Sequence, residues 1–393
     1  MELYHHSSPP FTAWILGSGL LREKFVVVDI GCQGGEHPRW ALLGGNVEVY
    51  GFDPIGEAID SLTKSAAPGR QFFAMALGET DGEAEFHVKA DTFSSSFFPS
   101  DPGHMNGPAD IQRGKRTVPV RRLDTLFEQG LIPPADHIKL DCEGFEPIIL
   151  KGARKYLAAS GPVCVTTESG FNLSAPFPYS HFHAVNEILA QHRLLVFDVN
   201  FDRPPRSTYA EALREHPWPE PDILSEAPHL DVGAPGTLNV IFCRDFAAEV
   251  VKQDTYRFAT MPAPPPGVDQ LIKAMINFEL HGLMDCAFDL AVQFREQLQD
   301  RFDVDKALEL LLTRPPHARN TGDVVNCLRM VAQLRAEAIA ARDLTAKIRD
   351  LTAKTKEMNA ELLQLKSTLE AIYASTSWKM GEPFRKLAAW LRR

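Results

Sequence analysis

The sequence predicts an α/β protein with a Rossmann-like, seven-stranded sheet, followed by a helical segment and a C-terminal coiled coil. Short apolar runs rich in β-branched residues alternate with helical patterns through the first 245 residues, which is typical of a mostly parallel sheet. The expected strands are 25–30, 47–52, 71–76, 137–141, 163–168, 194–199 and 237–243. We also expect an extra strand at 82–88, pairing as a hairpin with the end of the third strand.

A glycine turn follows the first expected strand and indicates a ligand site. Asp29 ends the run, and Gly31 and Gly34 lie in the turn DIGCQGG. Sheets of this class bind nucleotide-like ligands at the carboxyl ends of their strands. The turn is not a GxGxxG motif, so by itself it allows both a nicotinamide cofactor and S-adenosylmethionine. Asp29 could also serve only as a helix N-cap.

A second acidic residue ends the second expected strand. Asp53 follows the first glycine turn by about twenty residues, where a carboxylate can accept hydrogen bonds from both ribose hydroxyls of a cofactor. A helix is expected directly afterwards, over residues 55–64. The alternative is that Asp53 only shapes the turn before Pro54.

Composition excludes several classes of function. The chain has 41 basic and 51 acidic residues, a net charge of −10, so it lacks the electrostatic footprint of a nucleic-acid-binding protein. The six cysteines are scattered without a CxxC pair, which fits neither a disulfide framework nor a zinc site. With no apolar run of membrane-spanning length and no signal-peptide pattern, we expect a cytoplasmic protein.

The C-terminal region carries heptads. Residues 321–374 are expected to form a coiled coil with Thr355 as its one polar a position. The apolar d positions are Leu344, Leu351, Met358, Leu365 and Ile372, and the apolar a positions are Ile348, Leu362 and Leu369. This pattern favours a homo-oligomer, or docking to a partner enzyme. The alternative is a long amphipathic helix that lies on its own domain.

The last segment, 375–393, is a short basic stretch with apolar residues at helical spacing and two flanking tryptophans, Trp378 and Trp390. Such a helix suits a membrane surface, or an enzyme complex docked there. The alternative is a helix end that packs on a partner helix.

Two segments complete the expected organisation: an N-terminal segment, 1–23, and a helical segment, 246–320, between the sheet domain and the coiled coil.

Two segments in the middle of the chain resemble one known family. VPVRRLDTLFEQG at 118–130 and HIKLDCEGFEPIILKGA at 137–153 resemble the FkbM-type family of S-adenosylmethionine-dependent methyltransferases. The MALG turn at 75–78 and the fifth expected strand, which ends in Glu168, fit the same pattern. The resemblance covers about residues 24–245. It departs from the family at Cys32 and Gln33, where the family often has asparagine after a small residue.

The resemblance implies a seven-stranded methyltransferase sheet, S-adenosyl-L-methionine (SAM) as cofactor, and a set of site residues. Asp141, at the end of the fourth strand, is expected near the transferred methyl group as the base, with Glu143 and Glu168 sharing that role or orienting the acceptor. We predict no metal, although clustered carboxylates could instead hold a divalent cation. The expected cofactor-binding residues are Asp29, Gly31, Gly34, Asp53, Ala76, Leu77 and Asp141.

The predicted function is O-methylation of a hydroxyl. The coiled coil and the tail are similar to those of bacterial enzymes that build surface polysaccharides, so we expect a sugar of a glycan or glycolipid as acceptor, and either self-association or a glycosyltransferase partner at the inner membrane face. A small secondary metabolite is the alternative acceptor. A catalytically degenerate scaffold that presents the coiled coil is the alternative function. An NAD-dependent oxidoreductase is disfavoured because GxGxxG and a Tyr-x-x-x-Lys base are missing in the right context.

Overall fold

The chain divides into two compact units, Met1–Pro315 and Pro316–Arg393. In the first unit, the computed structural model describes residues 8–99, 111–170, 182–201, 237–247 and 265–313. In the second unit it describes five short stretches: 354–356, 358–362, 364–368, 370–371 and 385–386. Most of the predicted coiled coil and of the tail therefore lies outside the described residues.

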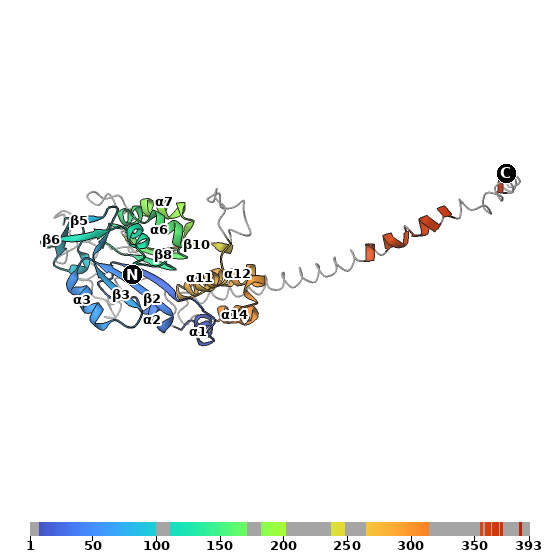
Figure 1. Cartoon of the computed structure of the whole chain (residues 1–393), viewed down its shortest axis with the longest axis horizontal. Coiled ribbons are helices and arrows are strands. Elements are labelled where there is room, and N and C mark those ends of the chain that lie inside the picture. Colours follow the sequence, from blue (N-terminus) through green and yellow to red (C-terminus); the bar gives the residue numbers. More distant parts are fainter. Residues whose placement is uncertain are drawn as a thin grey trace, which may run out of the picture. The chain divides into compact units, whose positions relative to one another are not determined.

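A seven-stranded mixed sheet forms the centre of the first unit, which confirms the predicted fold class (Figure 1). Its strands are β1 (Phe25–Ile30), β2 (Val47–Asp53), β3 (Arg70–Ala74), β7 (His137–Leu140), β8 (Cys164–Gly170), β9 (Leu194–Phe201) and β10 (Thr237–Arg244). Their order is β3-β2-β1-β7-β8-β10-β9. Neighbours are parallel except at β10, which runs antiparallel to both β8 and β9.

The strand order places a crevice at the carboxyl ends of β1 and β7. From β1 the chain winds outward through β2 to β3, and it later returns to the other side of β1 with β7. The connections on either side of this point leave the sheet in opposite directions, and ligands of α/β proteins bind where this happens. In the register of the sheet, Asp29 lies opposite Gly51 on one side and Lys139 on the other.

A second, three-stranded sheet was only partly foreseen. It contains β4 (Ala76–Leu77), β5 (Gly82–Lys89) and β6 (Gln112–Arg121) in the order β4-β6-β5. The prediction that 82–88 pairs with the end of the third strand is wrong, because β5 pairs antiparallel with β6. The expected strand 71–76 also ends early. A tight turn in which the Met75 amide donates to the Phe73 carbonyl (2.9 Å) redirects the chain into the second sheet.

Helices cover both faces of the large sheet because β1 alternates between two apolar cores. Val26, Val28 and Ile30 belong to one core, while Phe25 and Val27 belong to the other. The first core also takes residues of α4 (Leu123–Glu128), α5 (Glu146–Lys151), α6 (Arg154–Ser160) and α7 (Phe182–Gln191). The second takes residues of α1 (Pro10–Gly17), α2 (Pro38–Ala41), α11 (Val268–Leu280), α12 (Met284–Gln293), α13 (Arg295–Leu298) and α14 (Val304–Leu311). In the described part of the first unit, one further α-helix is α3 (Gly56–Ser65).

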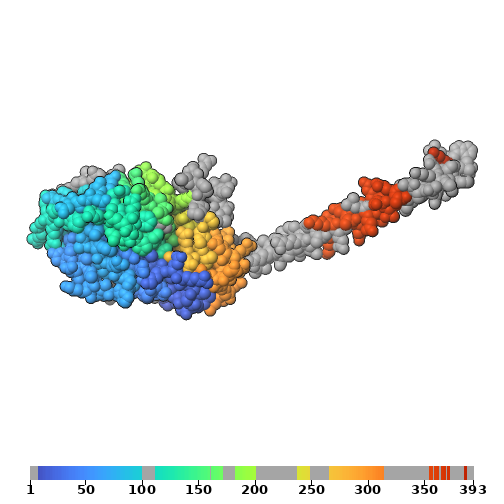
Figure 2. All heavy atoms as spheres, in the orientation of Figure 1, coloured from blue at the N-terminus to red at the C-terminus, as the bar shows by residue number. Residues whose placement is uncertain are grey.

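Helix α1 and helices α11–α14 pack together on one face of the sheet (Figures 1 and 2). Their contact includes a buried carboxylate. Glu279 of α11 is fully buried and accepts hydrogen bonds from the backbone amides of Phe11 and Thr12 and from the Thr12 hydroxyl, at 2.7–2.9 Å. It thereby satisfies amides in the first turn of α1 that have no partner within the helix.

The second unit, taken by itself, is helical where it is described. All of its described side chains are exposed, including Met358, Leu362 and Leu365 at 59%, 60% and 65%. Among the described residues of the whole chain, no helix combines the length and the apolar character needed to cross a membrane.

Candidate functional site

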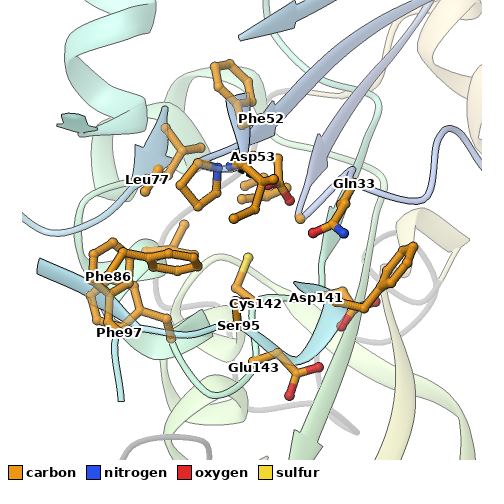
Figure 3. Close-up of a pocket in the computed structure, with 18 of the residues that line it drawn as sticks. Gln33, Phe52, Asp53, Leu77, Phe86, Ser95, Phe97, Asp141, Cys142 and Glu143 are labelled. Atoms are coloured by element: carbon orange, nitrogen blue, oxygen red, sulfur yellow. Dashed lines mark hydrogen bonds between the residues drawn. The ribbon is translucent and has the colours of Figure 1, made fainter. Parts of the chain in front are cut away.

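A pocket opens at the carboxyl edge of the large sheet. Its empty volume is about 800 Å³ when the open solvent at its mouth is included. The residues at or just beyond the ends of β1, β2, β7 and β8 line it, and the small sheet supplies part of its wall. Figure 3 shows Asp53 on one side of the cavity and Cys142 and Glu143 on the other. The predicted site residues that line it are Gly31, Asp53, Ala76, Leu77, Asp141, Glu143 and Glu168.

Gly31 allows the ends of β1 and β7 to approach closely. Its φ is +81°, and a Cβ atom at this position would lie 1.8 Å from the Asp141 carbonyl oxygen. The amides of Gly31 and Cys32 both donate to the Phe52 carbonyl at the end of β2, at 2.9 and 3.2 Å. The turn is therefore joined to both neighbouring strands, and only glycine fits at its first position.

Asp53 presents a buried carboxylate at the end of β2. One of its oxygens, Oδ1, accepts a hydrogen bond from the Ile55 amide at 2.8 Å, which orients the side chain. Burial raises the pKa of this carboxyl above its usual range. A carboxylate oriented in this way can accept hydrogen bonds from a diol inside the pocket.

The MALG turn, before β7 in the chain, and the LKGA segment, after β7, are in direct contact through two glycines. A Cβ atom at Gly152 would lie 2.0 Å from the Gly78 carbonyl oxygen, so the LKGA segment packs directly on the MALG turn. This contact sits beside Ala76 and Leu77, which are 5% and 2% exposed and line the pocket. Gly152 also separates α5 from α6.

Two predicted cofactor residues do not line the pocket. Asp29 is 3% exposed and does not line the cavity; instead, its Oδ1 lies 3.4 Å from the Lys139 ammonium. Gly34 is also absent from the lining, and a Cβ atom there would lie 3.3 Å from the Phe93 ring. Asp29 is therefore buried behind the lining residues, whereas Gly34 is exposed.

The three predicted catalytic carboxylates all line the pocket. Asp141 follows β7 directly, and 42% of its side chain is exposed. Glu143 has φ +53°, an unusual conformation for a residue other than glycine. The Ser96 hydroxyl donates to its carbonyl at 2.9 Å and so helps to hold this turn. Glu168 comes from β8.

Glu143 is expected to carry a proton at neutral pH. Its side chain faces solvent at the open pocket, yet the protein packed around its carboxyl raises the pKa to about 8, together with the negative charges of Glu168 and Asp141. A protonated carboxyl donates a hydrogen bond and is not a base. Asp141 and Glu143 are therefore suited to different tasks although they lie two residues apart.

Glu146 has a structural role. Its Oε1 accepts hydrogen bonds from the amides of Cys142 and Gly144 at 2.7 and 3.4 Å, which closes the turn between β7 and α5. Burial raises the pKa of this carboxyl to about 7. Glu146 therefore stabilises the turn that precedes α5 and does not line the pocket.

Aromatic residues of the pocket wall were missed by the sequence analysis. Phe86 of β5 contacts Phe97, and Phe97 contacts Phe145, with ring centroids 5.1 and 4.3 Å apart. Phe86 and Phe97 lie on the side of the cavity where Leu77 is found (Figure 3). The available signal was the alternation in β5, where Ala84, Phe86 and Val88 occupy every second position and pack in one apolar cluster.

Binding of a metal ion by the described residues would require a set of ligating side chains. Within that part of the chain, no group of three or more His, Cys, Asp or Glu side chains is arranged to hold a metal ion. Burial raises the pKa of the Cys142 thiol well above its usual range, so this pocket residue stays neutral.

A comparison with known families identifies the domain. The family model for the methyltransferase FkbM domain matches residues 33–195. Residues 33–195 form an FkbM-family methyltransferase domain. The family uses SAM as its cofactor, so the predicted cofactor class is confirmed. The FkbM domain thus contains most of the pocket residues described above, while β1 and its glycine precede it and β10 follows it.

The chain is also similar to individual methyltransferases of known sequence or structure. The FkbM domain is similar to the hexuronic acid methyltransferase AglP of Haloferax volcanii, at 28% identity over 151 residues, which cover 38% of this chain and 58% of that protein. The chain thus spans little more than half the length of this relative. Two crystal structures cover 59% of this chain, a methyltransferase FkbM of Methylobacillus flagellatus and a precorrin-6y C5,15-methyltransferase of Geobacter metallireducens. They are 17% and 12% identical, with 48% and 87% of their own chains covered and TM-scores of 0.29 and 0.28.

Proposed function

We propose that this chain is an O-methyltransferase that transfers a methyl group from SAM to a hydroxyl of a sugar. One observation carries the proposal: the pocket places the buried, oriented carboxylate of Asp53 and the more open carboxylate of Asp141 in the same cavity. The first suits the ribose of the cofactor, and the second suits the proton of an acceptor hydroxyl.

The residues present fit SAM. The Gly31 turn brings backbone against the cavity without a side chain, as binding of the cofactor tail requires. Asp53 would accept the ribose hydroxyls, and the apolar side chains of Phe52, Ile55 and Leu77 line the cavity around it for the adenine ring. The acidic pocket also complements the positive sulfonium centre.

When bound, SAM would supply an electrophilic methyl group that the acceptor oxygen attacks in line with the departing sulfur, which leaves as a neutral thioether. The protein then contributes alignment and proton removal, and alignment alone can contribute several kcal/mol. Asp141 would take the hydroxyl proton as the oxygen–carbon bond forms and the sulfur–carbon bond breaks. Glu143, protonated below about pH 8, would donate a hydrogen bond to the acceptor, and Glu168 would orient it.

A sugar acceptor is supported by two observations. The relative AglP is named as a hexuronic acid methyltransferase, so a relative of this domain acts on a sugar. Phe93 lines the pocket while 61% of it remains exposed, which leaves an aromatic face on which a sugar ring can pack. A small secondary metabolite with a hydroxyl group is the competing acceptor.

The decisive experiment is transfer of labelled methyl from SAM into fractionated glycans, with an Asp141→Asn variant as the negative control and Asp60→Asn, on the exposed side of α3, as the matched positive control. We expect label in glycan fractions for wild type and Asp60→Asn only. Label confined to small metabolites would contradict the sugar assignment. Absence of SAM binding by calorimetry would instead favour the non-catalytic scaffold.

We further propose that the C-terminal heptads pair with a second copy of this chain. The described residues Met358, Leu362 and Leu365 are helical, exposed and apolar, at successive d, a and d positions. Glu361 lies at a g position and Lys366 at the following e position, five residues later, the spacing that places opposite charges together in a parallel, in-register pair. The basic tail, 375–393, would then contact a membrane surface.

Light scattering tests the pairing. Deletion of 321–393 should lower the assembly to a smaller mass, and so should Leu362→Asp, whereas Ser367→Asp, at an f position, should leave the mass unchanged. Charge reversal at either Glu361 or Lys366 should weaken the assembly, and the double reversal should restore it. An unchanged mass after deletion would assign self-association elsewhere, and a glycosyltransferase would then be the expected partner of the heptads.

A further inference from the structure

Lys139 lies at the junction of the two strands that form the pocket. It belongs to β7 and lies opposite Asp29 of β1 in the register of the sheet. Its ammonium donates a hydrogen bond to the Gly31 carbonyl at 2.7 Å and lies 3.4 Å from both Asp29 Oδ1 and Asp141 Oδ2. One side chain therefore contacts the glycine turn, the buried acid behind it and the proposed base.

The charges at this junction depend on one another. Burial raises the pKa of Asp29, and the positive charge of Lys139 opposes that effect. Burial would lower the pKa of Lys139, but the carboxylates of Asp29 and Asp141 outweigh it and raise the pKa above its usual range. Lys139 is therefore ionised at neutral pH. Removing this cation would leave the Asp29 carboxylate buried beside no opposite charge, which is costly.

The contact with Gly31 constrains the turn from a second direction. The amide of Gly31 is already bonded to the Phe52 carbonyl of β2 at 2.9 Å. The Lys139 ammonium holds the carbonyl of the same residue from the β7 side. Both ends of this glycine are thus tied to neighbouring strands while it packs directly on the Asp141 backbone.

We propose that Lys139 is a positioning residue that holds Asp141 and the Gly31 turn in the geometry required for methyl transfer. This inference rests on the proposed function, because it assigns Asp141 the proton of the acceptor. The ammonium forms an ion pair with Asp141 Oδ2 and limits the directions in which the carboxylate can point. Lys139 does not line the pocket, so it acts through the residues that do.

The first test compares Lys139→Met with Lys115→Met. Lys115 is also paired with a carboxylate, Glu85, at 2.7 Å, but this pair is on the exposed surface of the small sheet. We expect Lys139→Met to lower kcat about 100-fold, the order of loss produced by small displacements of a catalytic group. Its dissociation constant for SAM should rise only a few-fold, and Lys115→Met should match wild type in both. Equal kcat in wild type and Lys139→Met would overturn the proposal.

A chemical rescue separates positioning from general damage to the fold. Lys139→Ala removes three carbons and the ammonium group, which together correspond to propylammonium. Added propylammonium should restore turnover of this variant at least ten-fold, whereas 1-propanol, similar in size but uncharged, should not. Equal rescue by both compounds would contradict a role for the charge, and rescue by neither would contradict local positioning.

A measurement of stability tests the junction independently of turnover. Lys139→Met should lower the unfolding midpoint in denaturant, and adding Asp29→Asn should recover part of the loss because the buried charge disappears. Additive losses would show that Lys139 and Asp29 are not coupled and would contradict the inference. If wild type itself transfers no methyl group to any acceptor, the proposed function fails, while this coupling still decides whether Lys139 organises the junction.

Discussion

The two ends of β7 carry ionisable groups in opposite settings. At its amino end, His137 is 1% exposed; its Nδ1 donates to Asn277 Oδ1 at 3.0 Å, and its Nε2 accepts from the Thr166 hydroxyl at 3.1 Å. Beyond its carboxyl end, Asp141 borders the pocket with 42% of its side chain exposed. The two residues are four positions apart, and their tasks differ because one end of the strand is closed by α11 and the other is open.

The difference shows that polar residues of this sheet can bind a ligand only where a cavity gives the ligand access to them. Burial lowers the pKa of His137 to about 3, so its ring is neutral, and hydrogen bonds satisfy both nitrogens. Such a group has no remaining capacity for an external ligand, and it stabilises the packing of α11 on the sheet. At the carboxyl end, the same sheet presents carboxylates to a cavity.

The largest effect should come from Gly31→Ala. The new Cβ atom would lie 1.8 Å from the Asp141 carbonyl oxygen, so β1 and β7 would have to separate at the pocket. We expect loss of detectable SAM binding and of turnover, measured by calorimetry and methyl transfer. Gly56→Ala at the start of α3 is the matched control, because nothing lies within 4 Å of its added carbon. Retained binding in Gly31→Ala would show that the edge tolerates separation.

Asp53→Ala should reduce SAM affinity by about 10²–10⁴-fold, because two charge-assisted hydrogen bonds of about 1.5–3 kcal/mol each would be lost. Calorimetry measures the affinity, and circular dichroism checks that the fold is kept. Asp29→Ala should also weaken binding, but through loss of the partner of Lys139, since Asp29 does not reach the cavity. Wild-type affinity in Asp53→Ala would remove it from the cofactor site.

Asp141→Asn should lower kcat by about 10²–10⁴-fold, as expected for loss of a general base. SAM affinity should stay within a few-fold of wild type, because the amide keeps the size of the side chain. Single-turnover methyl transfer with saturating SAM separates the two quantities. Full activity in this variant would move the role of base to Glu168.

At the other end of β7, His137→Asn should affect stability alone. We expect a loss of about 1–3 kcal/mol in the free energy of unfolding, because buried partners lose their hydrogen bonds. SAM affinity and kcat should not change. His183→Asn on the exposed side of α7 is the matched control. A change in kcat without a change in stability would contradict the division of β7 into a structural end and a functional end.

The pH dependence of unfolding gives a second measure of His137. The unfolded chain binds this proton at about pH 6.5, whereas the folded chain binds it only near pH 3. Between these values the unfolded state holds more protons, so the free energy of unfolding falls as the pH is lowered from about 6.5 towards 3. The His137→Asn variant should show a smaller fall over this window in chemical denaturation.

The smallest effect is expected from Glu143→Gln at neutral pH. Because the pKa of Glu143 is about 8, its carboxyl is protonated at pH 7, and glutamine keeps a hydrogen-bond donor there. We expect activity within about three-fold of wild type at pH 7. Above pH 8, wild type should lose activity as Glu143 ionises, while the variant should not. Parallel pH profiles would assign the alkaline limb to another group.

The sequence was sufficient for the large sheet because its central strands β1, β2 and β7 are almost wholly buried. The expected starts of β1, β2, β7, β9 and β10 coincide with the observed ones, since continuous apolar runs bounded by glycine or acidic residues have few other solutions. The small sheet was harder. Only part of β6 is apolar, and the turn at Met75 depends on where β3 stops pairing with β2.

By itself, the sequence determined the sheet, the family and the residues that gather at its carboxyl edge, because strand patterns and spaced motifs are local properties. The tertiary structure decided how those residues divide their tasks. It placed Asp29 behind the pocket wall beside Lys139 and made Glu146 the acceptor of hydrogen bonds within a turn. It also raised the pKa of Glu143 through the protein packed around its carboxyl and the neighbouring carboxylates. Burial and charge proximity arise from residues far apart in the chain, so only the folded packing could assign these roles.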